Sequence, residues 1–229
     1  LVLNKNFSDD MGVFMDVLDV KPEEKDKQLQ VLIRTFRTGE DTKLIYCAKS
    51  IEFDNLPNTI IGYYFDPNII HLFQYKSIEN RNIVARQGHA FVSTIHYRNY
   101  FEISNFLSYK HMYNGGTFSM FYLYGRDIVS WESDGKIVKS NKSVVLRNND
   151  FQLLPGIAYG KRGEIVDAHI LYGETFFTVE GLAMPGIAKA ESFSSLSYIN
   201  SILAQYAINR YCAQHKHAGY MNLLPMPDY

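Results

Sequence analysis

Cysteine and tryptophan are scarce in this sequence. Its 229 residues include two Cys and one Trp. Cys47 and Cys212 lie far apart in the chain, so a framework of several disulfides is excluded. Neither belongs to a CxxC pair, which argues against a structural zinc site. We therefore expect two reduced, buried thiols, with one disulfide between them as the open alternative, and we predict no metal and no cofactor.

Excess charge and long apolar runs are also absent. The formal net charge is -1, which gives the whole chain no electrostatic footprint for nucleic acid and leaves only a local basic patch open. The longest apolar runs fall well short of the roughly 20 residues that a membrane helix needs, so no transmembrane segment is expected. The sequence begins with Leu1 rather than Met, and we expect a processed or upstream segment to be missing. The compartment therefore stays undetermined.

Aromatic residues, in contrast, are plentiful. The chain has 17 Tyr and 15 Phe, and such residues favour the half-buried surface of a sheet. Short β-branched and aromatic runs alternate with turn residues between residues 59 and 180, which is typical of antiparallel strands. Asp134–Gly135 is predicted to join residues 128–131 and 137–138 in a hairpin. Further strands are predicted at residues 59–65, 69–75, 89–97, 118–124, 164–172 and 175–179.

The two flanks of this region predict helices. Residues 8–18 fit a short helix with an acidic cap, and Pro22 suits the start of another helix. Residues 29–36 fit a helical stripe and one face of a strand equally well; a hairpin is preferred there and a helix is kept as the alternative. Apolar residues three and four apart predict an amphipathic helix over residues 195–215.

Together these patterns predict one α+β domain spanning residues 1–229. It is expected to consist mainly of antiparallel sheet, curved or barrel-like, with a short N-terminal helix and a C-terminal amphipathic helix. No shift in composition marks a linker.

The first candidate for chemistry is the segment 156–163. It resembles a phosphate-binding P-loop, but the gap is one residue short, Arg162 replaces the hydroxyl residue, and a strand rather than a helix is predicted to follow. We therefore reject a P-loop. What remains is a turn between glycines carrying Lys161 and Arg162, which could bind a phosphate or a carboxylate or could simply be solvated.

The second candidate is the pair Asp167 and His169. Residues two apart on a strand project from the same face, so the carboxylate could orient the imidazole as a general base, or both could bind a metal. The alternative is a buried structural histidine. His89 and His96 have an odd spacing of seven, so they would face opposite sides of one regular strand.

A third candidate lies near the C-terminus. The six residues from Arg210 to His215 resemble the motif of HEPN-type ribonucleases, in which such a pair would activate the ribose hydroxyl and stabilise the phosphate. That family is an all-helical bundle, unlike the strand-rich chain predicted here. The alternative is that His215 and His217 stabilise the negative end of a helix dipole.

The aromatic runs themselves form a fourth candidate. Residues 63–65, 97–101 and 118–124 could stack on single-stranded nucleic acid or sugar, anchor a protein partner, or fill the core. We therefore expect a non-enzymatic binding or assembly domain of a larger complex, with a protein partner or self-association. The alternative is a nuclease-like or phosphodiesterase-like enzyme. Its catalytic residues would be Asp167, His169, His215 and His217, and its binding residues Lys161, Arg162 and Arg210.

Overall fold

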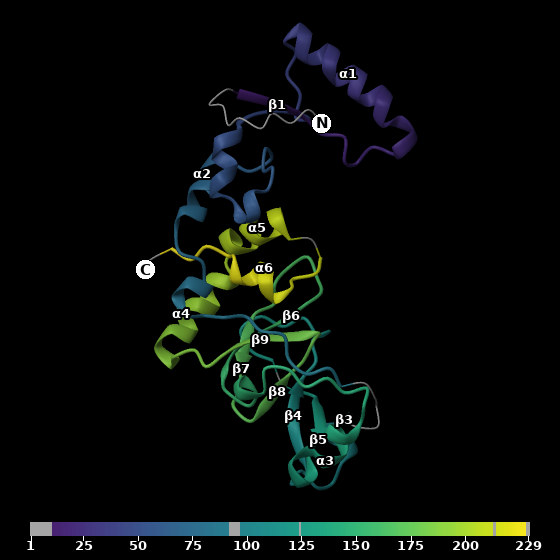
Figure 1. Ribbon diagram of the computed structural model, residues 1–229, viewed down its shortest axis with the longest axis vertical. Coiled ribbons are helices and arrows are strands. Elements are labelled where there is room, and N and C mark those ends of the chain that lie inside the picture. Colours follow the sequence, from purple (N-terminus) through teal and green to yellow (C-terminus); the bar gives the residue numbers. More distant parts are fainter. Residues whose placement is uncertain (1–10, 92–96, 124, 213, 228–229) are drawn as a thin grey trace. The chain divides into compact units, whose positions relative to one another are not determined.

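A computed structural model describes residues 11–91, 97–123, 125–212 and 214–227. Residue contacts divide the chain into two compact units, Leu1–Gln74 and Tyr75–Tyr229, and each is described by itself. Helices and mostly antiparallel sheets confirm the predicted α+β class (Figure 1). The described strands form sheets of two, four and three strands rather than a closed barrel. The prediction of one domain over residues 1–229 stays a prediction.

The first unit contains a two-stranded antiparallel sheet and one long helix. β1 (Met11–Met15) pairs with β2 (Ile45–Lys49), and η1 (Pro22–Glu24) leads into α1 (Lys25–Thr38) between them. The helix predicted over residues 8–18 is wrong from Met11 onward, because β2 supplies pairing partners that lie 30 to 38 residues away in the sequence. The hairpin preferred for residues 29–36 is also wrong. The helix kept as the alternative forms, and it ends where Gly39 takes a left-handed φ of 72°.

Short helical turns complete this unit where strands were predicted. They are η2 (Ser50–Asn55), η3 (Pro57–Thr59), α2 (Pro67–Ile70) and η4 (His71–Gln74), so the strands predicted at residues 59–65 and 69–75 are wrong. Asp66 explains part of the error. Its side chain accepts a hydrogen bond from the Asn68 N–H at 2.8 Å, and Pro67 occupies the first helical position, so a helix begins there.

The second unit contains two sheets. β3 (Tyr97–Asn99), β5 (Asp127–Ser130), β4 (Tyr109–Tyr113) and β8 (Thr175–Phe177) lie in that order, antiparallel except for the parallel pair β4–β8. β7 (His169–Leu171), β6 (Gly156–Gly160) and β9 (Gly181–Pro185) form an antiparallel sheet. Three 3-10 turns accompany them: η5 (Glu79–Arg81), η6 (Tyr100–Glu102) and η7 (Asn149–Phe151).

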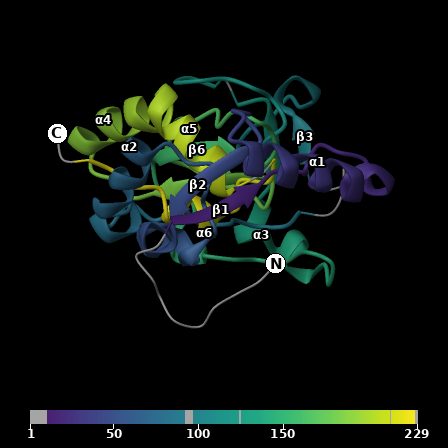
Figure 2. The same ribbon diagram turned by 90° about the horizontal axis from the view of Figure 1, so that it is seen from above.

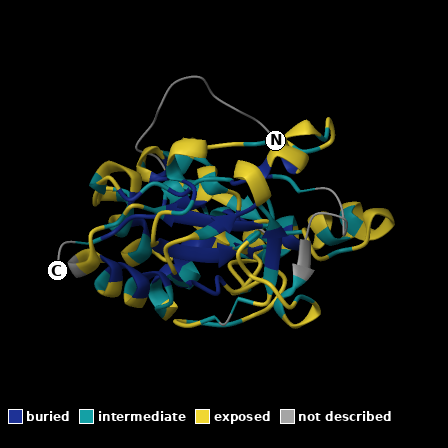
Figure 3. Cartoon of the chain, turned by 90° about the horizontal axis from the view of Figure 1, so that it is seen from below, coloured by how far each residue is buried: buried dark blue, intermediate teal, exposed yellow. Residues whose placement is uncertain are grey.

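The three-stranded sheet lies between helices and the other sheet. The helices α4 (Lys189–Ile199), α5 (Ile202–Tyr211) and α6 (Ala218–Asn222) lie on one side of it (Figures 1 and 2). Its other face packs Ala158 and Ala183 against Tyr113 and Phe177 of the four-stranded sheet. The strands are the most buried part of the unit, and the helices turn their exposed faces outward (Figure 3).

Small residues let these two sheets approach each other. A Cβ atom at Gly181 would lie only 2.5 Å from the ring of Tyr113, so the phenol packs directly against the β9 backbone. A Cβ atom at Gly160, the partner of Gly181 in β6, would lie 3.0 Å from the carboxylate of Asp167. Any larger residue at Gly181 would displace the buried Tyr113 ring.

Four amide side chains each hydrogen-bond both the N–H and the C=O group of a single residue; we call these contacts amide clamps. At the edge of β7, Asn200 accepts from the Ala168 N–H at 3.1 Å and donates to its carbonyl at 2.8 Å. The side chain thereby satisfies backbone groups that no full neighbouring strand reaches. The other three clamps are Gln205 on Val166, Gln152 on Phe177 and Asn222 on Ala85.

The C-terminal helix predicted over residues 195–215 is divided in two. α4 ends at Ile199 and α5 begins at Ile202, with Ser201 capping α5 by accepting from the Ala204 N–H at 3.2 Å. The break places Asn200 beside β7, where it forms its clamp. The amphipathic periodicity of the sequence runs through this break without revealing it.

The hairpin predicted at Asp134–Gly135 is wrong in its second half. β5 forms the first arm, but residues 132–140 form α3 (Glu132–Ser140) instead of a return strand. Asp134 and Gly135 do take positive φ angles, of 58° and 69°, and Ser133 joins them at 50°. The two residues thus make the left-handed turn that was expected, but the chain leaves it as a helix.

Of the other predicted strands, only parts form. β8 covers residues 175–177 of 175–179, and β7 covers residues 169–171 of 164–172. Residues 118–123 form no named strand, although Phe121 makes an isolated bridge to His169. In 89–97, isolated bridges involve His89 and Ala90, and residues 92–96 lie outside the described residues.

The first and last segments of the second unit pair with each other. The Ile78 N–H donates to the Leu224 carbonyl, and the Met226 N–H donates to the Lys76 carbonyl, each at 2.9 Å. Ser77 and Pro225 form the bridge between these bonds. The segment that enters the unit is therefore held against the segment that leaves it.

The amide clamps yield a test. We expect Asn200→Asp to destabilise the protein by about 2 kcal/mol, because a carboxylate cannot donate to the Ala168 carbonyl and would repel it. Urea unfolding monitored by far-UV circular dichroism measures the change.

Asn209→Asp is the matched control. Asn209 only accepts a hydrogen bond, from the buried Lys216 ammonium at 2.6 Å, and an aspartate can accept it as well. Equal urea midpoints for Asn200→Asp and the unchanged protein would contradict the role given to the clamp.

Candidate functional site

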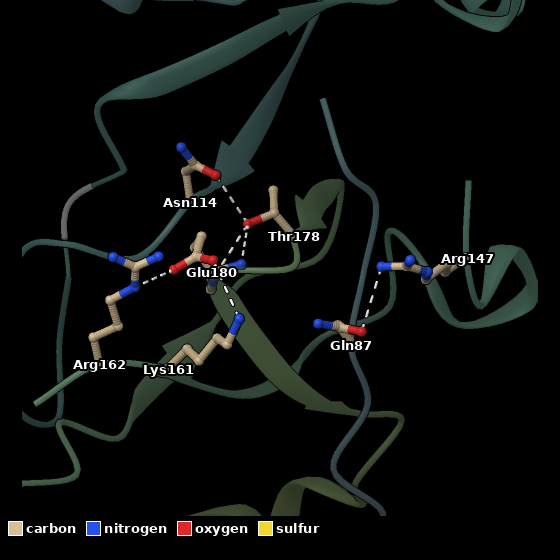
Figure 4. A network of polar contacts seen from close by, with 8 residues as sticks. Gln87, Asn114, Arg147, Lys161, Arg162, Thr178 and Glu180 are labelled. Carbon is tan, nitrogen blue, oxygen red and sulfur yellow. Dashed lines mark hydrogen bonds and ion pairs between the residues drawn. The ribbon is translucent and has the colours of Figure 1, made fainter. Parts of the chain in front are cut away.

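Lys161 and Arg162 follow directly after β6, at the turn singled out from the sequence. The next element after them is β7 rather than a helix. Both side chains reach the same carboxylate: Lys161 Nζ lies 3.3 Å and Arg162 Nε 2.8 Å from Glu180 (Figure 4). Burial opposes ionisation of Glu180, but its hydrogen bonds and ion pairs with these two cations lower its pKa below the usual value. The Glu180 carboxylate is thus already the anionic partner of both cations of this turn.

Thr178 fixes the position of Glu180. Its hydroxyl accepts hydrogen bonds from the N–H groups of Glu180 at 3.3 Å and Gly181 at 3.1 Å, and it donates to Asn114 Oδ1 at 3.0 Å (Figure 4). The Lys161 N–H also donates to the Glu180 carbonyl at 2.9 Å. Backbone and side-chain contacts therefore hold the carboxylate in front of Lys161 and Arg162.

The C-terminal segment pairs with this turn. The Gly163 N–H donates to the Gln214 carbonyl at 3.1 Å, and the Lys216 N–H donates to the Lys161 carbonyl at 2.7 Å. The structure thereby brings Arg162 and His215 together as backbone partners. Arg162 and His215 are 53 positions apart in the chain, so no local sequence pattern predicts this contact.

His215 and His217 lie beside each other, with ring centroids 6.0 Å apart, and line a shallow hollow with Gln214 and Tyr220. Arg210 instead places its guanidinium over the ring of Tyr206, 4.4 Å from the centroid. Backbone contacts therefore join the segment of His215 and His217 to the Lys161–Arg162 turn.

Asp167 and His169 are both buried at the edge of the three-stranded sheet. Asp167 Oδ1 accepts from the Gly160 N–H at 2.8 Å, and His169 Nδ1 lies 3.0 Å from the Asp167 carbonyl oxygen rather than from its carboxylate. Burial raises the pKa of Asp167, against the effect of its backbone hydrogen bonds, and burial lowers the pKa of His169. The arrangement favours a neutral imidazole and gives the carboxylate a structural hydrogen bond.

Tyr113 is a neighbour that the sequence did not single out. Its ring meets the ring of His169 edge-on at 4.5 Å, and its buried hydroxyl has no hydrogen-bond partner among the described residues. Burial, and then the nearby Asp167, raise the pKa of Tyr113. Tyr113 and His169 line a largely apolar cavity of about 250 Å³ with Tyr122 and Tyr172. Nothing in the sequence distinguishes Tyr113 from the other tyrosines.

The predicted aromatic runs separate into core and surface. Residues 63–65 pack within the first unit, where Phe65 joins a buried cluster. In the second unit, Phe101, Phe118 and Tyr122 are 70%, 64% and 55% exposed. They gather around a hollow of about 570 Å³, together with Arg126; we call this the aromatic hollow. Tyr124 and the side chain of Tyr97 lie outside the described residues.

Phe121 extends the same segment in a strained conformation. Its φ is 69°, which is unusual for a bulky residue, and its ring is exposed. The Phe121 N–H donates to the Ala168 carbonyl at 2.8 Å, and its carbonyl accepts from the Ile170 N–H at 3.2 Å. Pairing with β7 therefore holds this exposed segment in place.

The remaining candidates are a metal site, the two cysteines and His96. No group of three or more His, Cys, Asp or Glu side chains gathers within the part of the chain described. Cys47 and Cys212 are thiols, and Cys47 is exposed rather than buried, which corrects half of the prediction. His96 lies outside the described residues.

His89 is buried beside Arg147. Its Nδ1 accepts the Arg147 backbone N–H at 3.1 Å, and its side chain is 2% exposed. Burial lowers its pKa to about 4. The imidazole is therefore neutral at pH 7, with its proton on Nε2.

No family model matches the chain, and no curated protein matches it significantly in sequence. The function proposed below therefore rests on the residues and contacts just described.

His89 predicts a pH dependence of stability. Its folded pKa of about 4 lies below the usual 6.5, so the unfolded chain takes up a proton first as the pH falls. This contribution to stability is present above pH 6.5 and is lost as the pH falls toward about 4. His89→Asn keeps an acceptor for the Arg147 N–H and does not titrate, so we expect it to lose less stability over this range. Urea unfolding from pH 7 to pH 4 measures this.

His71→Asn, at an exposed histidine of the first unit, is the control and should keep the pH dependence of the unchanged protein. Parallel pH profiles for His89→Asn and the unchanged protein would show that folding does not lower the pKa of His89.

Proposed function

We propose that this chain is a non-enzymatic binding domain of a larger complex and that the aromatic hollow is its contact surface. The supporting observation is the gathering of three aromatic side chains, each more than half exposed, around one hollow. Exposed apolar clusters of this kind are uncommon on a protein surface that contacts only water. Aromatic and Arg side chains also contribute much of the binding energy at protein interfaces.

The surroundings of the hollow support the same proposal. Phe121 is strained and yet fixed by two hydrogen bonds to β7, and such strain is common in segments that bind a ligand. Because the backbone is already held, a partner would not have to order it on binding. Arg126 adds an exposed cation at the edge of the hollow.

A nucleic acid is the second candidate for the partner, and the distribution of charge favours it. The second unit has 15 Lys and Arg against 12 Asp and Glu, a net charge of +3, whereas the first unit has 8 against 12, a net charge of -4. The overall charge of -1 therefore conceals a basic unit. Exposed aromatic rings interleaved with cations suit the stacking of unpaired bases.

The enzymatic alternative has weaker support. Arg162 and His215 are backbone partners, but Glu180 accompanies both Lys161 and Arg162, and His169 lines a different cavity from the C-terminal histidines. A phosphate would have to compete with Glu180 for both cations. We therefore prefer the binding function to the enzymatic one.

Photo-crosslinking tests the contact surface. We expect p-benzoylphenylalanine at position 118 to give one discrete crosslinked product in cells of the source organism, because this side chain is exposed at the hollow. The product should be lost when Phe101→Ala removes a neighbouring ring.

The same photo-reactive residue at position 193 is the matched control, since Phe193 is 61% exposed on α4 and does not line the hollow. Identical crosslinking from positions 118 and 193 would count against the hollow as the contact surface.

Fluorescence anisotropy with labelled single-stranded and duplex oligonucleotides tests the second candidate. If a nucleic acid is the partner, Phe118→Ala should weaken single-strand binding by about 1–3 kcal/mol through lost stacking. Arg126→Gln should reduce the slope of log affinity against log salt by about 1.

Lys189→Gln removes an exposed cation on α4 and serves as the control, which should bind like the unchanged protein. Affinity that neither falls with salt nor responds to Phe118→Ala would leave a protein as the partner.

A further inference from the structure

A second cavity of the second unit lies under Trp131, at the start of α3. It has a volume of about 280 Å³, and its lining residues differ from those of the aromatic hollow. Its apolar walls come from Trp131, Phe176, Leu146 and Leu153. Trp131 and Phe176 lie with ring centroids 4.4 Å apart, so part of the wall is a rigid aromatic corner. The space is large enough for a single six-membered ring with a small substituent.

The cavity also has a buried hydrogen-bond donor. His89 lines it and is 2% exposed. Because its Nδ1 accepts the Arg147 N–H and lies 3.4 Å from the Gln152 amide nitrogen, the proton of the neutral ring lies on Nε2. Gln152, which also lines the cavity, already uses its amide to clamp Phe177. The Nε2–H group of His89, a residue that lines the cavity, is thus the donor that a ligand there could use.

The charges at the cavity cancel. Lys139 and Asp134 both line it, and their charged groups lie 2.6 Å apart. Lys139 is also held over the Trp131 ring, 5.4 Å from its centroid. A charged ligand would gain no net attraction from this pair, so an uncharged one is favoured.

Strained backbone surrounds this cavity. Asp134 and Leu153, which line it, have φ angles of 58° and 66°. Ser133, next to Asp134, and Asn148, next to the lining residue Asn149, have φ angles of 50° and 51°. Such conformations persist only where the surrounding structure holds them, and they concentrate at ligand-binding sites. Residues with positive φ angles therefore occur both in the wall that contains Trp131 and in the wall that contains Leu153.

We propose that this cavity binds a small, uncharged aromatic molecule that carries a carbonyl oxygen. The oxygen accepts a hydrogen bond from His89 Nε2, and the ring packs against Trp131 and Phe176. The site is independent of the binding function proposed for the aromatic hollow, because the two have different lining residues. A negative result for one proposal therefore does not contradict the other.

Trp131 provides a direct measurement, because it is the single tryptophan of the chain. We expect benzamide to change its fluorescence saturably, with a Kd of about 1 mM, as suits a ligand of this size. Benzoate and benzylamine have the same ring but carry a charge, and they should bind at least tenfold more weakly. Equal binding of all three, or no saturable change with benzamide, would overturn the proposal.

Two variants locate the ligand. His89→Asn keeps the acceptor for Arg147 and removes the Nε2 donor, and it should weaken benzamide binding about tenfold. Leu146→Phe fills the cavity and should abolish binding. His71→Asn, in the first unit, should bind as the unchanged protein does.

Circular dichroism verifies that each variant is folded, and Leu146→Phe decides the question alone if His89→Asn does not fold. Undiminished binding by Leu146→Phe, or by folded His89→Asn, would place the ligand elsewhere and overturn the assignment.

Discussion

Buried backbone groups need hydrogen-bond partners, and in the second unit amide side chains supply them where strands end. Asn200 and Gln205 come from opposite sides of the α4–α5 junction and bind alternate residues, Ala168 and Val166, along one strand edge. This spacing fixes the register between the helices and the sheet, because a shift of one residue would leave both amides facing the wrong peptide. Together with the backbone of Phe121, which bonds Ala168 and Ile170, the amides close an edge that would otherwise be open to another strand.

The candidate residues depend on this arrangement. With the 166–168 segment held from the helix side, Asp167 and His169 face the other sheet, where Gly160 and Gly181 leave room for Tyr113. The backbone of Phe121 pairs with the same edge, next to Asn200: both donate a hydrogen bond to the Ala168 carbonyl. One short stretch of chain thus supports a buried polar cluster and an exposed aromatic segment at once.

Local chemistry predicted local features well and long-range ones poorly. Asp134 and Gly135 took the positive φ angles expected of them, and Pro22 stood at the start of a helix, since both depend on neighbouring residues alone. Residues 29–36 matched two periodicities, and only their environment selected the helix.

The candidate site shows the same division. Lys161 and Arg162 were recognisable as paired cations, and the aromatic runs as candidates for a surface. The acid that accompanies the cations, Glu180, lies 19 residues from Lys161 and is brought there by β9, and no local pattern encodes that contact. The division of aromatic runs into core and surface likewise depends on which strands find partners.

The first and last segments of the second unit, residues 76–78 and 224–226, are paired with each other. A module whose entry and exit lie side by side can be inserted into a surface loop of a host protein without stretching it, and it can be lost or exchanged in the same way.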